Sequence, residues 1–144
     1  MEHTTQKHRE EKVRTWFAMW LQKQDSGLQE LFSHDAVYIE SWGPEYHGNQ
    51  AIKLWFDEWN TRGTVLLWEI KQFFHRENQS VVEWTFRCTM QDGTVQSFDG
   101  LSLLRWTPEN QICFLQEFGC NSARYNPYAQ GEKPIFRDEP SLWF

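Results

Sequence analysis

Hydrophobic side chains recur with helical spacing in the first sixty residues of the chain. Five of them, at i, i+3, i+4, i+7 and i+8, lie on one helix face: Val13, Trp16, Phe17, Trp20 and Leu21. A third helix is predicted from the same spacing at Ile52, Trp55, Phe56 and Trp59, with Asn49 as its cap and Gly63 at its end. A short helix at residues 28–32 lies between the two. The N-terminal half is therefore predicted to be mainly helical.

Beyond Gly63 the apolar positions alternate with polar ones, which predicts strands. The clearest run places Val82, Trp84, Phe86, Cys88 and Met90 on one face. Strands are also predicted at residues 37–41, 66–74, 94–106 and 112–120, and Gly100 predicts a bulge or a sharp bend. Helices followed by long consecutive antiparallel strands predict an α+β fold. We expect a curved sheet wrapped around the three helices, with a conical internal pocket.

Residues 1–122 are predicted to form this single domain, and residues 123–144 a proline-containing tail. Pro127, Pro134 and Pro140 interrupt regular structure there. The tail nevertheless carries apolar side chains, namely Ile135, Phe136, Leu142, Trp143 and Phe144. We therefore expect the tail to pack on the domain or on a neighbouring subunit.

Composition excludes several classes of function. The 144 residues include 14 Lys and Arg against 20 Asp and Glu, a net charge of −6, which argues against nucleic acid as a partner. The apolar runs are too short to span a membrane, and the N-terminus has no apolar core of a signal peptide. Three widely spaced cysteines favour a cytoplasmic protein with reduced thiols. Nucleotide-binding motifs and histidines at metal-ligand spacing are absent, so we expect no cofactor and no metal.

Glu40 is the first candidate for chemistry. It shares a strand face with Tyr38, and Trp42 follows on the same side if the strand continues. A carboxylate among aromatic rings has its pKa raised by desolvation, toward values useful for proton transfer near neutral pH. The alternative is a strand glutamate that lies in solvent or pairs with an arginine.

The segment from His34 to Gly43, followed by Gly48 and the helix that contains Ile52, resembles the nuclear transport factor 2-like superfamily. It is most similar to the polyketide cyclase (SnoaL-like) and ketosteroid isomerase branch, and the resemblance covers roughly residues 13–121. This resemblance implies a cone-shaped α+β barrel, often dimeric through the outer face of its sheet. It also implies a general base at the end of the first strand, where Glu40 stands.

Two further carboxylates are candidates through the same resemblance. Asp99 could occupy the position of the isomerases' neutral aspartic acid, and Glu117 that of the cyclases' late-strand acid. Asp99 could equally mark a bend with Gly100, and Glu117 could be a structural partner of Arg87 or Arg105; the inward face of that strand is undecided. The isomerases' first-helix tyrosine has no counterpart here, since Trp16 and Phe17 stand in its place.

Aromatic residues make up 17% of the chain and include nine tryptophans. Most fall on apolar stripes, where core packing is the first interpretation. Those that line the pocket would select a flat, mostly apolar ligand. The candidate ligand-binding residues are Tyr38, Trp16, Phe17, Trp20, Trp42, Phe56, Trp84 and Phe86. The expected function is binding of a small hydrophobic molecule by a homodimer, with cofactor-free acid–base chemistry of the isomerase or cyclase type. A non-catalytic binding or dimerising protein is the alternative.

Overall fold

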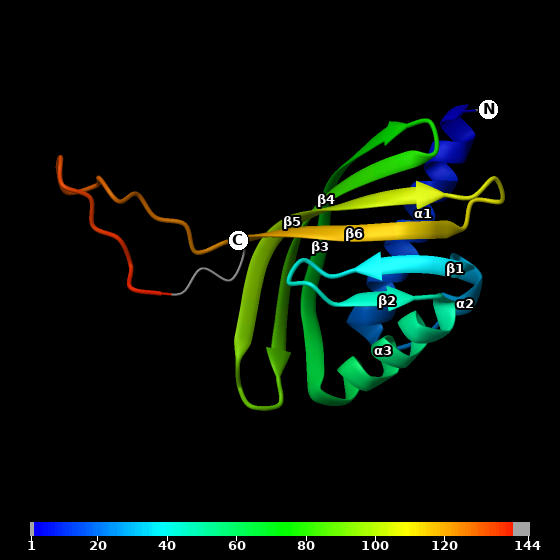
Figure 1. Ribbon diagram of the computed structural model, residues 1–144, viewed down its shortest axis with the longest axis horizontal. Helices are drawn as coiled ribbons and strands as arrows, with labels where there is room; N and C mark the ends of the chain where they lie inside the picture. The colour runs from blue at the N-terminus through cyan, green and yellow to red at the C-terminus, as the bar shows by residue number, and fades with distance from the viewer. Residues whose placement is uncertain (1, 140–144) are drawn as a thin grey trace.

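The computed structural model describes residues 2–139, and these form three helices and six strands (Figure 1). The helices are α1 (Glu2–Gln22), α2 (Leu28–Leu31) and α3 (Asn49–Arg62). The strands are β1 (Phe32–Ile39), β2 (Glu45–His47), β3 (Gly63–Arg76), β4 (Gln79–Met90), β5 (Val95–Trp106) and β6 (Ile112–Asn121). The predicted α+β fold is confirmed, and the predicted strands of the C-terminal half are all present.

Within residues 2–139 the strands form a six-stranded sheet in the order β2-β1-β6-β5-β4-β3. The hairpins from β3 to β6 are antiparallel, as predicted. The first strand differs from the prediction, because β1 pairs with β6 in parallel. The short strand β2, predicted as loop, covers the other edge of β1. The parallel pairing places the first strand beside the last one and so brings Glu40 next to β6.

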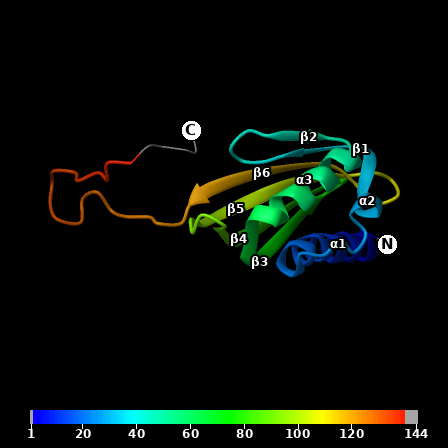
Figure 2. The ribbon, with the colours of Figure 1, turned by 90° about the horizontal axis from the view of Figure 1, so that it is seen from below.

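The helices cover one face of the curved sheet, which does not close on itself (Figure 2). The core between the two layers is largely aromatic. Trp16 and Phe17 of α1 are buried there, as are Phe56 of α3 and Trp84 of β4. Ring contacts run through this core, for example the stacking of Phe17 on Trp68 with centroids 3.8 Å apart. Burial of such rings contributes most of the energy that holds helices and sheet together.

Asn49 and Gly100 do not have the structural roles that the sequence predicts for them. Asn49 does not cap α3, because Gly48 precedes the helix and the Asn49 side chain instead donates to the Gln29 carbonyl at 3.1 Å. Gly100 causes no bulge, since β4 and β5 pair through it without a register shift. A Cβ at Gly100 would lie 2.5 Å from the Trp84 ring, so this glycine allows the indole to rest directly on the strand.

The segment after Asn121 extends away from the domain (Figures 1 and 2). The first residues of this segment are attached to the sheet by an ion pair between Arg124 and Asp99 at 2.8 Å. Further along, the Arg137 guanidinium lies 4.1 Å from the centre of the Tyr125 ring, and the segment folds back on itself there. The described part of the tail therefore does not pack on its own domain. Leu142, Trp143 and Phe144 lie outside the described residues.

Candidate functional site

Glu40 and Glu117 lie side by side on the inner face of the sheet. In the parallel pair, Tyr38 is opposite Leu115 and Ile39 is opposite Gln116, so Glu40 follows beside Glu117. Leu115 is fully buried, and Glu117 has the same strand parity, which shows that it faces the helices. The structure thus settles the face that the sequence left undecided. We call Glu40 and Glu117 the carboxylate pair.

Each member of the carboxylate pair accepts a hydrogen bond from a tyrosine. Tyr46 of β2 donates its hydroxyl to Glu40 at 2.6 Å, and Tyr38 of β1 donates to Glu117 at 2.5 Å. Behind Tyr38, the Trp16 indole N–H donates to the tyrosine oxygen at 3.4 Å. Two similar groups thus have unlike surroundings, because Tyr38 is fully buried and Tyr46 is only half-buried.

The two environments shift the acidities of the pair to different degrees. Burial raises the pKa of Glu117 to about 8, and the nearby charge of Glu40 adds to the increase. Burial also raises the pKa of Glu40, but hydrogen bonds from Tyr46 and Trp42 and the charge of Arg62 act against the increase. Glu117 is therefore mainly protonated at neutral pH, with a proton to donate. Such a divergence between neighbouring carboxyl groups is the pattern that assigns acid and base roles.

Aromatic rings pack against the tyrosine partners of the carboxylate pair and also lie on the inner face of β4 and β5. Trp55 of α3 stacks on Tyr46 with centroids 4.5 Å apart and also contacts Tyr38 at 4.8 Å. On the neighbouring strands, Phe86 and Phe98 contact each other at 4.9 Å on the inner face. Glu40, Glu117, Phe86, Phe98 and Trp55 are all half-buried although they face inward. We call the part of the interior that they bound the open end, because side chains there reach solvent.

The aromatic residues predicted to bind ligand divide into three groups. Trp16, Phe17, Trp20 and Phe56 belong to the closed core and are at most 3% exposed. Tyr38, Trp84 and Phe86 are close to the open end, where Tyr38 and Trp84 are themselves buried. Trp42 lies on the loop after β1 and is 71% exposed, with its side chain hydrogen-bonded to Glu40.

Asp99 does not join the carboxylate pair. Its strand neighbours Phe98 and Gly100 face inward, so Asp99 projects from the outer face of the sheet. There it forms an ion pair with Arg124 and accepts a hydrogen bond from Thr85 at 2.9 Å. The hydrogen bond from Arg124 lowers the pKa of Asp99. This placement corrects the expectation that Asp99 could act as a neutral acid beside Glu40.

Tyr46 and Trp55 were not among the predicted site residues. Tyr46 lies in a strand of three residues, which is too short to leave an alternating pattern. Trp55 lies on the apolar stripe of its helix, and that position indicates packing without showing what the ring packs against. Its contacts with both tyrosines depend on the pairing of β1 with β2, which the sequence did not indicate.

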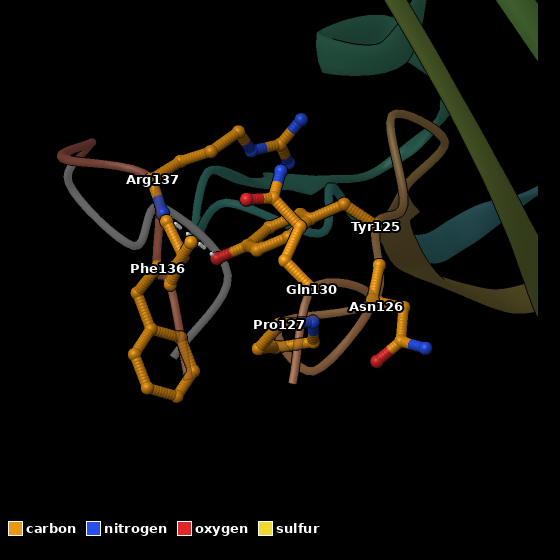
Figure 3. Close-up of a pocket in the computed structure, with 8 residues that line it drawn as sticks. Tyr125, Asn126, Pro127, Gln130, Phe136 and Arg137 are labelled. Carbon is orange, nitrogen blue, oxygen red and sulfur yellow. Dashed lines mark hydrogen bonds between the residues drawn. The ribbon is translucent and has the colours of Figure 1, made fainter. Parts of the chain in front are cut away.

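In the part of the chain that the structure describes, two hollows lie away from the carboxylate pair, one of about 170 Å³ near Lys23 and Arg62 and one of about 380 Å³ within the tail. The tail hollow is lined by Tyr125, Pro127 and Phe136 (Figure 3). Among residues 2–139, no cluster of His, Cys, Asp and Glu could hold a metal ion. None of the helices described there has the length and apolarity needed to cross a bilayer.

Comparison with known proteins identifies the family. The SnoaL-like domain matches residues 13–113, more than two thirds of the chain. The protein belongs to the SnoaL-like domain family. Glu40 lies within the matched segment of this SnoaL-like protein, whereas Glu117 lies just beyond it. Among curated proteins, none matches the chain.

Solved structures show the same fold at low sequence identity. A ketosteroid isomerase-like protein from Catenulispora acidiphila, in complex with trimethylamine, is 20% identical with a TM-score of 0.65; the match covers 78% of this chain and 87% of that one. An NTF2-like protein of unknown function from Burkholderia pseudomallei is 13% identical, with a TM-score of 0.65 and coverages of 78% and 90%. TerC, co-crystallised with polyporic acid, is 14% identical, with a TM-score of 0.64 and coverages of 78% and 91%. The SnoaL-like protein therefore has the fold of the NTF2-like superfamily.

Proposed function

We propose that this SnoaL-like protein binds a small, flat, mostly apolar carbonyl compound at the open end and moves a proton on it without a cofactor. The observation that carries the proposal is the carboxylate pair, two glutamates on adjacent strands with different acidities. Similar structures hold small organic molecules, trimethylamine in one and polyporic acid in another, which supports a ligand of this size. The aromatic rings around the pair favour a flat ligand.

In this proposal Glu40 is the general base. Its carboxylate removes a proton from a carbon next to the carbonyl group, and the electron pair of that C–H bond moves toward the carbonyl oxygen. Tyr46 and Trp42 hold Glu40 by hydrogen bonds that favour its ionised form. General-base catalysis by a positioned carboxylate contributes a rate factor of roughly 10²–10⁴.

Glu117 is the general acid. Because the pKa of Glu117 is about 8, this carboxyl keeps its proton at neutral pH and can deliver it to a second atom of the ligand. Proton removal at one atom and proton delivery at another together make an isomerisation or a cyclisation. The rate is expected to fall above about pH 8, where Glu117 loses its proton.

The test uses 2-tetralone, a flat bicyclic ketone with acidic protons next to its carbonyl. Exchange of those protons in D₂O is followed by ¹H NMR with the wild type, Glu40→Gln, Glu117→Gln and the control Glu69→Gln. Glu69 is exposed on the outer face of the same sheet, so its variant tests for general effects of a lost carboxylate. We expect acceleration by the wild type and by the control, and a loss of about 100-fold or more in Glu40→Gln.

Two outcomes would contradict parts of this proposal. If 2-tetralone binds but its exchange matches that in protein-free buffer, the protein is a non-catalytic binder of such molecules. If Glu40→Gln accelerates exchange as well as the wild type does, Glu40 is not the base.

A further inference from the structure

Two tryptophans have buried indole N–H groups with no acceptor among the described residues, Trp20 and Trp68. Other buried indoles of the chain are satisfied, since Trp84 donates to Ser102 and Trp106 donates to Ser80, both at 2.9 Å. A buried donor without a partner costs roughly 1–3 kcal/mol and calls for an explanation. One explanation is that the acceptor is supplied by a ligand.

Of the two, Trp68 lies in the same row of inward-facing side chains as Phe86 and Phe98 of the open end. In the sheet register Trp68 is opposite Phe86, and Phe86 is opposite Phe98, so the three face inward in one row. Phe86 and Phe98 are half-buried, and Trp68 is 8% exposed at the inner limit of that row. Trp20 is deeper and contacts the rings of Trp55, Phe56 and Trp59.

The ring of Trp68 is held in one orientation. Phe17 stacks on one side of the indole, with centroids 3.8 Å apart and planes 11° from parallel. Trp84 and Phe86 meet it edge to face at 5.8 and 5.3 Å. A side chain fixed by three rings cannot rotate to find an acceptor elsewhere. The direction of its N–H is therefore preorganised.

We infer that the Trp68 indole N–H is a ligand-binding donor, which selects a flat aromatic molecule that carries a carbonyl or hydroxyl oxygen. This inference rests on the proposed function, because it assigns a ligand class to the same open end. The aromatic rings bind the flat skeleton, and Trp68 recognises the oxygen. A ligand without that oxygen leaves the indole N–H without an acceptor and forfeits the hydrogen bond.

The experiment compares 9-fluorenone with fluorene, which share a flat skeleton and differ in the ring carbonyl. Binding of each to the ¹⁵N-labelled full chain is followed through the indole N–H signals, with Trp68→Phe used to assign the Trp68 signal. We expect fluorenone to move the Trp68 signal downfield and fluorene to leave it in place. The signals of Trp84 and Trp106, which already have acceptors, serve as internal controls.

Affinity gives an independent readout. The wild type is expected to bind fluorenone about 5- to 10-fold more tightly than fluorene, the range typical of one buried neutral hydrogen bond. Trp68→Phe keeps a ring at this position and is expected to abolish the preference while fluorene binding stays within about twofold. Should this variant fail to fold, Trp68→Leu takes its place in both the signal assignment and the affinity measurement.

The possible failures are distinguishable. If both compounds bind equally and the Trp68 signal does not move, the inference is overturned while the open end remains a binding site. If neither compound binds, both the inference and the proposed binding of flat apolar molecules are overturned.

Discussion

The position of Glu117 on its strand explains why its pKa is raised. A carboxylate on an inner sheet face loses hydration, and the single hydrogen bond from Tyr38 does not replace what is lost. The charge of Glu40 on the next strand adds repulsion. The neutral form is therefore favoured, and folding itself becomes linked to the proton on this residue.

This linkage predicts how stability depends on pH. With a pKa of about 8 in the folded chain and an ordinary value of 4.5 when unfolded, Glu117 binds its proton more tightly in the folded state. Its contribution to the free energy of unfolding is thus fully present below about pH 4.5 and is lost as pH rises to about 8, by a few kcal/mol. Glu117→Gln stays neutral at every pH. Thermal unfolding between pH 5 and pH 8.5 should show the wild type losing stability relative to this variant, and parallel curves would refute the linkage.

Tyr46 controls the other member of the carboxylate pair. Its hydroxyl donates to Glu40, which favours the ionised form, while its ring stacks on Trp55. Tyr46→Phe removes the donor and keeps the stacking, so the pKa of Glu40 is expected to rise. A ¹³C NMR titration of the Glu40 carboxyl in both proteins measures the change. An unchanged or lowered pKa in Tyr46→Phe would show that the hydrogen bond does not stabilise the carboxylate.

How far the sequence predicts a site residue depends on the pattern around it. The position of Glu40 was predictable because β-branched and aromatic residues mark its strand and because the family resemblance implies a general base at the end of that strand. The face of Glu117 was not, because both faces of β6 carry apolar side chains: Leu115 is buried inside while Phe118 is exposed outside. The neighbour that fixes the face of Glu117 is β1, about 75 positions earlier in the chain, and local periodicity carries no information about that pairing.

At the level of elements, α1 is joined to the sheet by a hydrogen-bonded network as well as by its apolar face. His75 of β3 contacts Glu10 of α1 at 2.8 Å and Ser80 of β4 at 2.8 Å. Trp106 of β5 donates to the same Ser80 hydroxyl. The buried Ser80 of β4 thus connects β3 and β5 and, through His75, the helix α1.

Removal of this hydroxyl is expected to destabilise the fold. Ser80→Ala leaves the Trp106 N–H and one histidine nitrogen without a partner in the interior, at a cost of roughly 1–3 kcal/mol. Urea unfolding of the variant and of a control, Ser41→Ala in the loop after β1, measures the difference. A loss no larger in Ser80→Ala than in the control would mean that the network contributes nothing to stability.

Element boundaries show where sequence patterns stop being informative. The strands β3 and β4 followed from alternation and β5 and β6 from the turns that join them, and each of the four runs for ten residues or more. The start of β1 at Phe32 and the three residues of β2 did not, since short segments are defined by the strands they pair with. The apolar stripe that began at Val13 marks most of the buried part of α1, but the helix begins at Glu2, its Arg9 is buried, and Leu21 at the end of the stripe is exposed.

At the scale of the whole molecule, the outer face of the sheet leaves apolar side chains uncovered. Leu101 and Phe118 are opposite each other in β5 and β6 and are 42% and 49% exposed. The predicted homodimer would cover such a face. We expect the full chain to sediment as a dimer and Phe118→Asp to shift it toward monomer with an unchanged circular dichroism spectrum. A monomeric wild type, or a variant that remains dimeric, would rule out this face as the contact.

The tail is expected to contribute little to the stability of the domain. The hydrogen bonds of residues 126–139 are made within residues 123–139, including the bond from the Arg137 backbone N–H to the Tyr125 hydroxyl at 3.1 Å. The tie to the sheet, from Arg124 to Asp99, lies before this stretch. A chain that ends at Tyr125 keeps that ion pair, so its melting temperature should stay within about 2 °C of the full chain, which corresponds to well under 1 kcal/mol.

Thermal unfolding at several protein concentrations measures the change. A larger fall in melting temperature that does not depend on protein concentration would show that the tail packs on the domain. A fall that grows with concentration would show that the tail packs on a second copy.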